Sequence, residues 1–119
     1  MTTVLIAEDD YSNYLYLEEL FEGNEVTLIY ASNGQEAVEI CSKNKDINLV
    51  LMDIRMPVMN GYLATKQIKS MRPDLPIVAQ TAYGLETEMK GLKADFDDII
   101  FKPINRAIFK HKLSKFIPL

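Results

Sequence analysis

The chain has a single cysteine, Cys41, among its 119 residues, so an internal disulfide is excluded. Cys41 falls in a segment with helical spacing, and we expect it to be a small buried residue and not a reactive thiol. No apolar run approaches the roughly 20 residues that a membrane-spanning helix needs. Residues 1–3 carry no basic charge, and the apolar stretch 4–7 is too short for a signal peptide. These absences predict a soluble, cytoplasmic protein with no direct membrane contact.

Basic residues are in the minority. Thirteen lysines and arginines stand against 17 aspartates and glutamates, which gives a formal net charge of −4 and a pI near 5.0. This balance argues against nucleic-acid binding as the main activity, so no direct nucleic-acid partner is expected. Arg106, Lys110, Lys112 and Lys115 do gather near the end of the chain, where they are interpreted as solvated charges favoured by a helix dipole. His111 among them is interpreted as a surface residue.

Short apolar stretches alternate with segments of helical spacing along the whole chain. Hydrophobic residues make up 48% of the sequence, and the length suits a single domain over residues 1–119. Strands are expected at residues 4–7, 26–30, 49–52, 76–79 and 99–101. Helices are expected at about residues 12–23, 33–42, 61–72, 84–92 and 105–116. This alternation predicts an α/β fold, a flavodoxin-like (βα)5 doubly wound sheet of five parallel strands in the order 2-1-3-4-5.

Polar residues and glycines mark the expected helix ends, and apolar spacing marks the inner faces. Ser12 or Asn13 is expected to cap the first helix, and Asn33-Gly34 to begin the second. Helical spacing predicts these inward side chains: Tyr14, Leu17, Leu20 and Phe21 in the first helix; Ala37, Val38 and Cys41 in the second; and Ile108, Phe109, Leu113 and Phe116 in the last. The third helix is indicated by the apolar positions Tyr62, Leu63 and Ile68, with Lys66 and Lys69 between them.

The stretch 49–61 organises the rest of the chain. It begins with four consecutive apolar residues, which is typical of a strand covered on both faces, and it continues into Asp53. Other expected strands end on Glu8-Asp9, on Thr81 and on Lys102. Because the carboxyl ends of parallel strands share one edge of a sheet, these side chains are expected to meet there, with the first and third strands adjacent at the switch point.

Three carboxylates in one crevice repel one another unless a cation lies among them. Carboxylate oxygens, a backbone carbonyl and waters suit Mg²⁺. A nucleophilic carboxylate, a metal, an ammonium and a hydroxyl are together the groups that handle a phosphoryl group. Each residue alone also has an ordinary interpretation: Asp53 as a turn residue, Lys102 as a solvated cation, and the run 8–10 as the first turn of a helix. Their coincidence at four strand ends favours the phosphoryl site.

Four motifs in these places resemble those of one known family, the receiver domains of two-component response regulators. The resemblance covers the whole chain, and the sequence around the second motif is most similar to the receiver modules of hybrid sensor histidine kinases. The motifs are residues 6–10 (Ile-Ala-Glu-Asp-Asp), residues 53–61 (Asp-Ile-Arg-Met-Pro-Val-Met-Asn-Gly), residues 80–82 (Gln-Thr-Ala) and residues 101–103 (Phe-Lys-Pro). The second of them is highly specific.

The resemblance implies a role for each matching position. Asp53 would take a phosphoryl group from a phosphohistidine. Asp9, Asp53 and the backbone carbonyl of Arg55 would bind Mg²⁺, with Glu8 acting through a bound water. Thr81 would donate a hydrogen bond to the phosphoryl group, and Lys102 would pair with it. The Lys102–Pro103 peptide bond would be cis.

The implied partner is a sensor histidine kinase or a histidine phosphotransfer protein, and the chain is expected to be either a separate module or part of a longer hybrid kinase. The implied function is that of a signalling module that catalyses its own Mg²⁺-dependent phosphorylation and slow dephosphorylation. Three other classes share parts of the pattern. A haloacid-dehalogenase-like phosphatase would need an acid where Arg55 stands, and a flavodoxin-like electron carrier would need a phosphate loop after the first strand. A receiver that is never phosphorylated would act by binding alone.

One position departs from the family pattern. The family usually carries an aromatic residue three positions before the lysine, and this chain has Ile99 there. An isoleucine has no ring to turn inward and is stiff at χ1. We therefore expect that signal output through the face formed by the fourth helix and fifth strand is weakened or rerouted.

Overall fold

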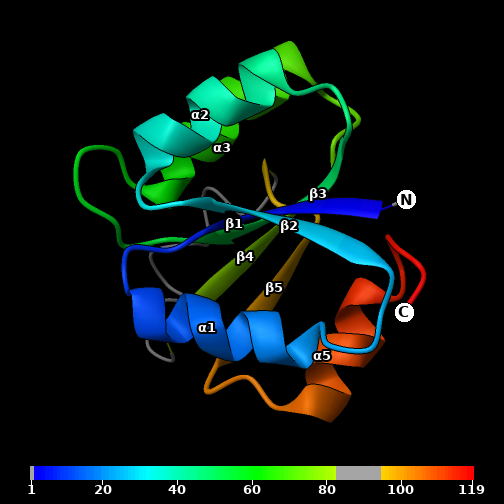
Figure 1. Cartoon of the computed structure of the whole chain (residues 1–119). Helices are drawn as coiled ribbons and strands as arrows, with labels where there is room; N and C mark the ends of the chain where they lie inside the picture. The colour runs from blue at the N-terminus through cyan, green and yellow to red at the C-terminus, as the bar shows by residue number, and fades with distance from the viewer. Residues whose placement is uncertain (1, 83–94) are drawn as a thin grey trace.

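Five parallel strands form the centre of the molecule, in the order β2-β1-β3-β4-β5 (Figure 1). The computed structural model describes residues 2–82 and 95–119, and the helix expected at residues 84–92 lies outside them. The strands are β1 (Thr2–Ala7), β2 (Val26–Ala31), β3 (Ile47–Asp53), β4 (Ile77–Ala82) and β5 (Asp98–Lys102). The described helices are α1 (Tyr11–Leu20), α2 (Gly34–Lys43), α3 (Gly61–Met71) and α5 (Arg106–Leu113). The predicted flavodoxin-like fold and strand order are confirmed.

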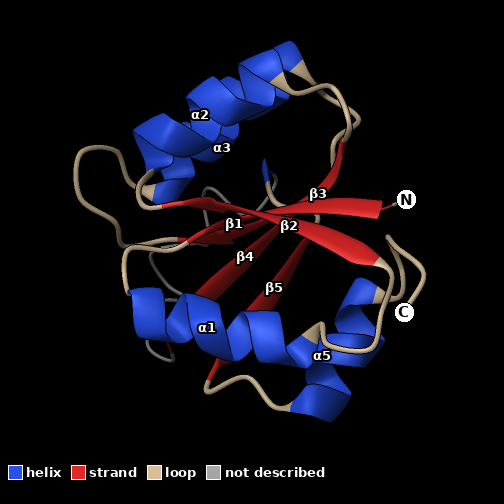
Figure 2. Ribbon diagram, viewed as in Figure 1, coloured by secondary structure: helices blue, strands red, loops and turns tan. Residues whose placement is uncertain are grey.

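Helices cover both faces of the sheet. Figure 2 shows α2 and α3 on one face and α1 with α5 on the other. Alternate residues of one strand therefore enter two different cores: Leu5 and Ala7 pack on the side of α2, whereas Val4 and Ile6 pack with α1 and α5. This is why the apolar runs lack alternation in the sequence. Cys41 is buried in α2, as expected, and burial raises the pKa of its thiol to about 11.

Each described helix begins at an Asp or Asn whose side chain accepts a hydrogen bond from the helix's first turn. The N-caps are Asp10, Asn33, Asn60 and Asn105. Such a cap stabilises a helix by about 1 kcal/mol. The expectation that Ser12 or Asn13 caps α1 was wrong. Asp10 takes that place because its carboxylate reaches the backbone N–H and the hydroxyl of Ser12.

In α3 one of the apolar positions faces outward, and the inner face of α5 differs from the expectation. Leu63 is 47% exposed, because the side chains of α3 that face the sheet are Ala64, Thr65 and Ile68. Small residues at this contact let α3 lie close to its neighbours. Ile108 is likewise 45% exposed, whereas Phe109 and Leu113 are buried. Phe116 lies beyond the end of α5 and is only half-buried, and Ile117 is buried in its stead. Of the helices that the structure describes, none could cross a membrane.

The loop after β3 is held against two helices by close backbone contacts. The Gly61 N–H donates to the Ile54 carbonyl at 2.8 Å, and the Gly34 N–H donates to the Met59 carbonyl at 3.0 Å. A Cβ on Gly61 would lie 2.1 Å from the Asp53 carbonyl oxygen, and one on Gly34 would lie 2.3 Å from the Met59 carbonyl oxygen. Both positions therefore need glycine to let the chain approach so closely. These contacts fix the end of β3, where Asp53 is located.

The same loop contains a strained residue. Val58 has a φ of 68° and is 81% exposed, and the Met59 N–H donates across it to the Pro57 carbonyl at 2.7 Å. This i→i+2 bond defines a γ-turn around a β-branched residue, which seldom adopts a positive φ.

We predict that Val58→Gly raises the free energy of unfolding by about 1 kcal/mol, since relief of backbone strain exceeds the entropy cost of glycine. Urea denaturation of the two proteins measures the difference. Val58→Thr keeps the β-branched shape and should leave the stability unchanged. A Val58→Gly protein less stable than the parent would show that the turn stores no strain.

Candidate functional site

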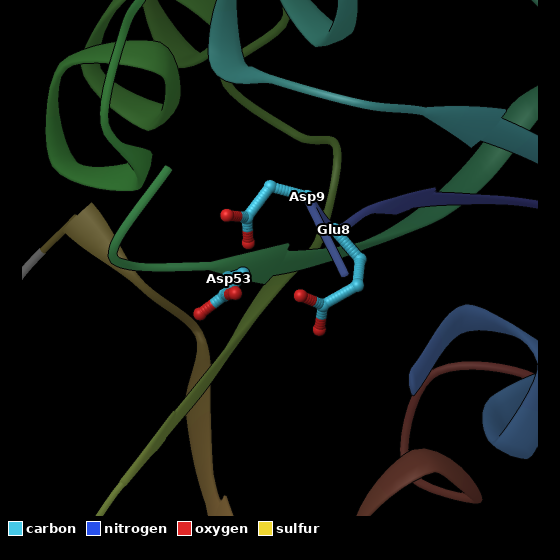
Figure 3. Close-up of side chains that lie close together, drawn as sticks. All are labelled: Glu8, Asp9 and Asp53. Carbon is cyan, nitrogen blue, oxygen red and sulfur yellow. The ribbon is translucent and has the colours of Figure 1, made fainter. Parts of the chain in front are cut away.

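Three carboxylates meet where β1 and β3 end. Glu8 and Asp9 directly follow β1, and Asp53 is the last residue of β3, the strand next to it. One carboxylate oxygen from each residue lies within 4.8 Å of the others. Figure 3 shows the three side chains converging on one space. Glu8 and Asp53 are buried, whereas Asp9 is exposed. We call these residues the acidic cluster. The predicted meeting of these strand ends is therefore found.

Lys102 supplies the positive charge beside the acidic cluster. Its Nζ lies 3.4 Å from Asp53 Oδ2 and 3.3 Å from Glu8 Oε1. The lysine is the last residue of β5, and the peptide bond that joins it to Pro103 is cis, as the family resemblance implied. The hydroxyl of Tyr16 on α1 donates to the carbonyl of Ile104, so α1 contacts the chain just after Lys102. This contact could not be predicted from the sequence, because its partners are 88 residues apart.

The surroundings of Asp53 favour its neutral form. Burial is the largest cause, followed by hydrogen bonding to Glu8 and then by the negative charge of Glu8; together they raise the pKa of Asp53 to about 7 despite the opposing effect of Lys102. An ionised Asp53 therefore needs more positive charge than one lysine supplies. The chemistry of the donor set fits a hard divalent cation: when all three carboxylates are ionised, the single ammonium leaves two net negative charges.

Two amide side chains extend the site toward α1. The Asn13 Nδ2 donates to Glu8 Oε1 and lies 3.4 Å from Gln80 Oε1. Gln80 is fully buried on β4, in register with Asp53 on β3. From the sequence, Asn13 was expected only as a possible helix cap, and no separate role was expected for Gln80. The sequence position of Asn13 could have suggested a place at the site, because Asn13 lies about one helical turn beyond Asp9, on a helix that begins at the site.

Thr81 lies near the end of β4, the strand next to β3, which carries Asp53. Its side chain is 1% exposed, and its hydroxyl has no hydrogen-bond partner within residues 2–82 and 95–119. A buried hydroxyl without a partner costs free energy, so it marks a position where another acceptor is expected.

The remaining positions singled out in the sequence lie around this centre. Arg55 has an exposed side chain and, with Asp9, lines an open groove of about 420 Å³ beside the acidic cluster. Asp10 caps α1 and lies outside the acidic cluster. His111 is exposed, as expected. Ile99 is half-buried against the core on the α2 side, and its carbonyl accepts a 2.8 Å hydrogen bond from Lys112 Nζ.

The raised pKa of Asp53 predicts that the cation-free protein loses stability as the pH rises. The unfolded chain releases this proton near pKa 3.8, whereas the folded chain keeps it to about 7. Stability should therefore fall between about pH 4 and pH 7 and then level off. Asp53→Asn removes this ionisable group. It should raise the free energy of unfolding at pH 8 by roughly 2 to 4 kcal/mol and leave that at pH 4 nearly unchanged.

Urea denaturation with a chelator present, at several pH values, measures this difference. Asp46→Asn, at an exposed aspartate in the α2–β3 loop, is the matched control and should show no such pH-dependent gain. An equal effect of Asp53→Asn at pH 4 and pH 8 would contradict the prediction.

Known proteins are similar to this chain in both sequence and structure. A family model, the response regulator receiver domain, matches residues 4–114. The autoinducer 1 sensor kinase/phosphatase LuxN of Vibrio campbellii is 33% identical over 115 residues, which are 97% of this chain and 13% of that protein. The transcriptional regulatory protein ZraR of Escherichia coli K12 is 33% identical over 103 residues, or 86% of this chain and 23% of that protein. The chain thus spans less than a quarter of these relatives.

Two solved structures are similar over nearly the whole chain. The receiver domain of a sensor histidine kinase from Pseudomonas aeruginosa, solved with a magnesium ion in its active site cleft, has a TM-score of 0.87 and 28% identity, covering 97% of this chain and 96% of that one. A receiver domain from Saccharomyces cerevisiae, crystallised with a histidine phosphotransfer protein, has a TM-score of 0.85 and 29% identity, covering 97% of this chain and 88% of that one. With the family model and the strand-end carboxylates, these likenesses show that the chain belongs to the receiver domains of two-component response regulators.

Proposed function

We propose that this chain is the phosphoacceptor module of a phosphorelay and that Asp53 receives the phosphoryl group. The observation that carries the proposal is the placement of Asp53: a buried carboxylate at a strand end, within 3.4 Å of a lysine ammonium and beside two further acids. A lone turn aspartate would have neither the burial nor this set of neighbours. Residues 1–119 would act as one receiver domain.

The proposed cation is Mg²⁺, held by Asp9, Asp53 and the backbone carbonyl of Arg55, with Glu8 acting through a water. Support comes from the oxygen-only donor set and its two net negative charges. When bound, Mg²⁺ would keep Asp53 ionised and neutralise charge on the incoming phosphoryl oxygens. The likeness to a receiver domain solved with magnesium agrees with this choice.

The transfer would exchange one bond for another. An oxygen of Asp53 attacks the phosphorus of a phosphohistidine, so a P–O bond forms as the P–N bond breaks. The electron pair of the P–N bond remains on the imidazole nitrogen, which then takes a proton from solvent. Lys102 Nζ would pair with the phosphoryl oxygens and balance the negative charge that arrives. Subsequent hydrolysis by water would return Asp53 to its free form.

Thr81 would bind the product of this transfer. Its hydroxyl is buried and lacks a partner in the described parts of the chain, so a hydrogen bond to a phosphoryl oxygen would satisfy it. Movement of Thr81 toward Asp53 would bring the end of β4 with it. Because Ile99 replaces the usual aromatic on β5, this movement is proposed to be the main conformational response.

The proposed donor is a sensor histidine kinase or a histidine phosphotransfer protein in the cytoplasm. A hybrid signal transduction histidine kinase of Dictyostelium discoideum is 34% identical over 86% of this chain, which covers 6% of that protein. A receiver domain similar in structure was crystallised with a histidine phosphotransfer protein. These likenesses support a place for this chain either in a longer hybrid kinase or as a separate module.

We predict that incubation with acetyl phosphate and Mg²⁺ adds one phosphoryl group to the protein, as measured by intact mass. Asp53→Asn should abolish the gain, and so should omission of Mg²⁺ with a chelator present. Lys102→Ala should lower the rate by at least about tenfold, since one charge-stabilising group is typically worth 2 kcal/mol or more.

Asp46→Asn and Lys45→Ala, two exposed residues in the α2–β3 loop, serve as matched controls and should be phosphorylated like the parent. A phosphoryl group on the Asp53→Asn protein would place the acceptor elsewhere. No gain in the parent protein would favour a receiver that acts by binding alone.

A further inference from the structure

We propose that Asn13 and Gln80 form an amide pair that positions Glu8 for cation binding. The inference rests on the proposed function, because it assigns these two residues to the same site. Neither belongs to the acidic cluster, and among the described residues neither side chain is hydrogen-bonded to the Asp53 carboxylate. They would be positioning residues, acting only through the Glu8 carboxylate.

Glu8 is a carboxylate that the fold must hold firmly. Its side chain is only 1% exposed, so its oxygens depend on hydrogen-bond donors of the protein more than on bulk water. Oε2 accepts a hydrogen bond from the Asp10 N–H at 3.2 Å. Oε1 accepts from Asn13 Nδ2 and is also 3.3 Å from Lys102 Nζ. Of these donors, Asn13 is the one neutral side chain, and its removal would take one hydrogen bond from Oε1.

A neutral donor has an advantage at this place. An amide fixes the direction of a carboxylate without cancelling its charge, whereas a second lysine would compete with the cation. Because Asn13 is neutral, the acidic cluster and Lys102 together have two net negative charges when all three carboxylates are ionised, which matches a divalent ion. Hydrogen bonds of this kind, one step beyond the metal's own ligands, commonly change metal affinity tenfold or more.

Gln80 in turn orients Asn13. Its Oε1 lies 3.4 Å from Asn13 Nδ2, on β4 beside Asp53, and it can accept the amide hydrogen that Glu8 does not use. The Gln80 side chain is fully buried, and its Nε2 has no partner among the residues that the structure describes. A buried, unpartnered amide is unfavourable for stability. An apolar side chain of similar size would serve the core better, so a role in the site explains why glutamine is found there.

The test is Mg²⁺ binding to the whole chain, measured by isothermal titration calorimetry, with thermal unfolding of the cation-free protein alongside. Asn13→Ala and Gln80→Met should each weaken Mg²⁺ binding, by about tenfold for Asn13→Ala and less for Gln80→Met. Gln80→Met should unfold at the same temperature as the parent or higher, because it removes a buried donor that has no partner among residues 2–82 and 95–119. Asn24→Ala, at an exposed asparagine just beyond the other end of α1, is the control and should bind Mg²⁺ like the parent.

A double-mutant cycle with Glu8→Gln separates positioning from a general effect on folding. In the Glu8→Gln background, Asn13→Ala should cause no further loss of Mg²⁺ affinity. Full additivity of the two losses would overturn the proposal, and so would variants that bind Mg²⁺ normally but unfold at a lower temperature. If the parent protein itself bound no Mg²⁺, the proposed function would fail before this inference was reached.

Discussion

The crowding of Glu8, Asp9 and Asp53 against a single ammonium is the constraint on which the site depends. Burial of Glu8 and Asp53 removes the water that would separate their charges, and Lys102 offsets only part of the repulsion between them. The fold therefore favours the protonated form of Asp53, and a bound cation would favour loss of that proton. A site of this kind is costly to the protein alone and becomes favourable only when a ligand arrives.

The scaffold creates this crowding by simple means. Parallel pairing of β1 with β3 places Ala7 opposite Met52, so Glu8 and Asp53 follow at adjacent strand ends. Gly61 and Gly34 let the next loop pack closely behind Asp53. Asp10 and Asn60 begin the helices that follow β1 and β3, which directs the chain away from the crevice. The site is left open on the side where Asp9 and Arg55 line a groove.

Much of this could be predicted from the sequence, and the reasons are physical. Unbroken apolar runs identify strands covered on both faces, and the shared edge of a parallel sheet then brings Glu8, Asp53 and Lys102 together. Side-chain contacts between distant segments could not be predicted. The bonds from Asn13 to Glu8 and from Tyr16 to Ile104 depend on how α1 lies against the sheet. The inward placement of Ile108 was wrong, because the neighbouring Phe109 and Leu113 form the buried face of α5.

The central claim is that the fold itself raises the pKa of Asp53 and that a cation reverses this. The most direct measurement is an NMR titration of the Asp53 side-chain carboxyl carbon, with and without Mg²⁺. The account predicts a pKa near 7 in the cation-free protein and a value well below that when Mg²⁺ is saturating. An ordinary aspartate pKa in the cation-free protein, unchanged by Mg²⁺, would contradict it.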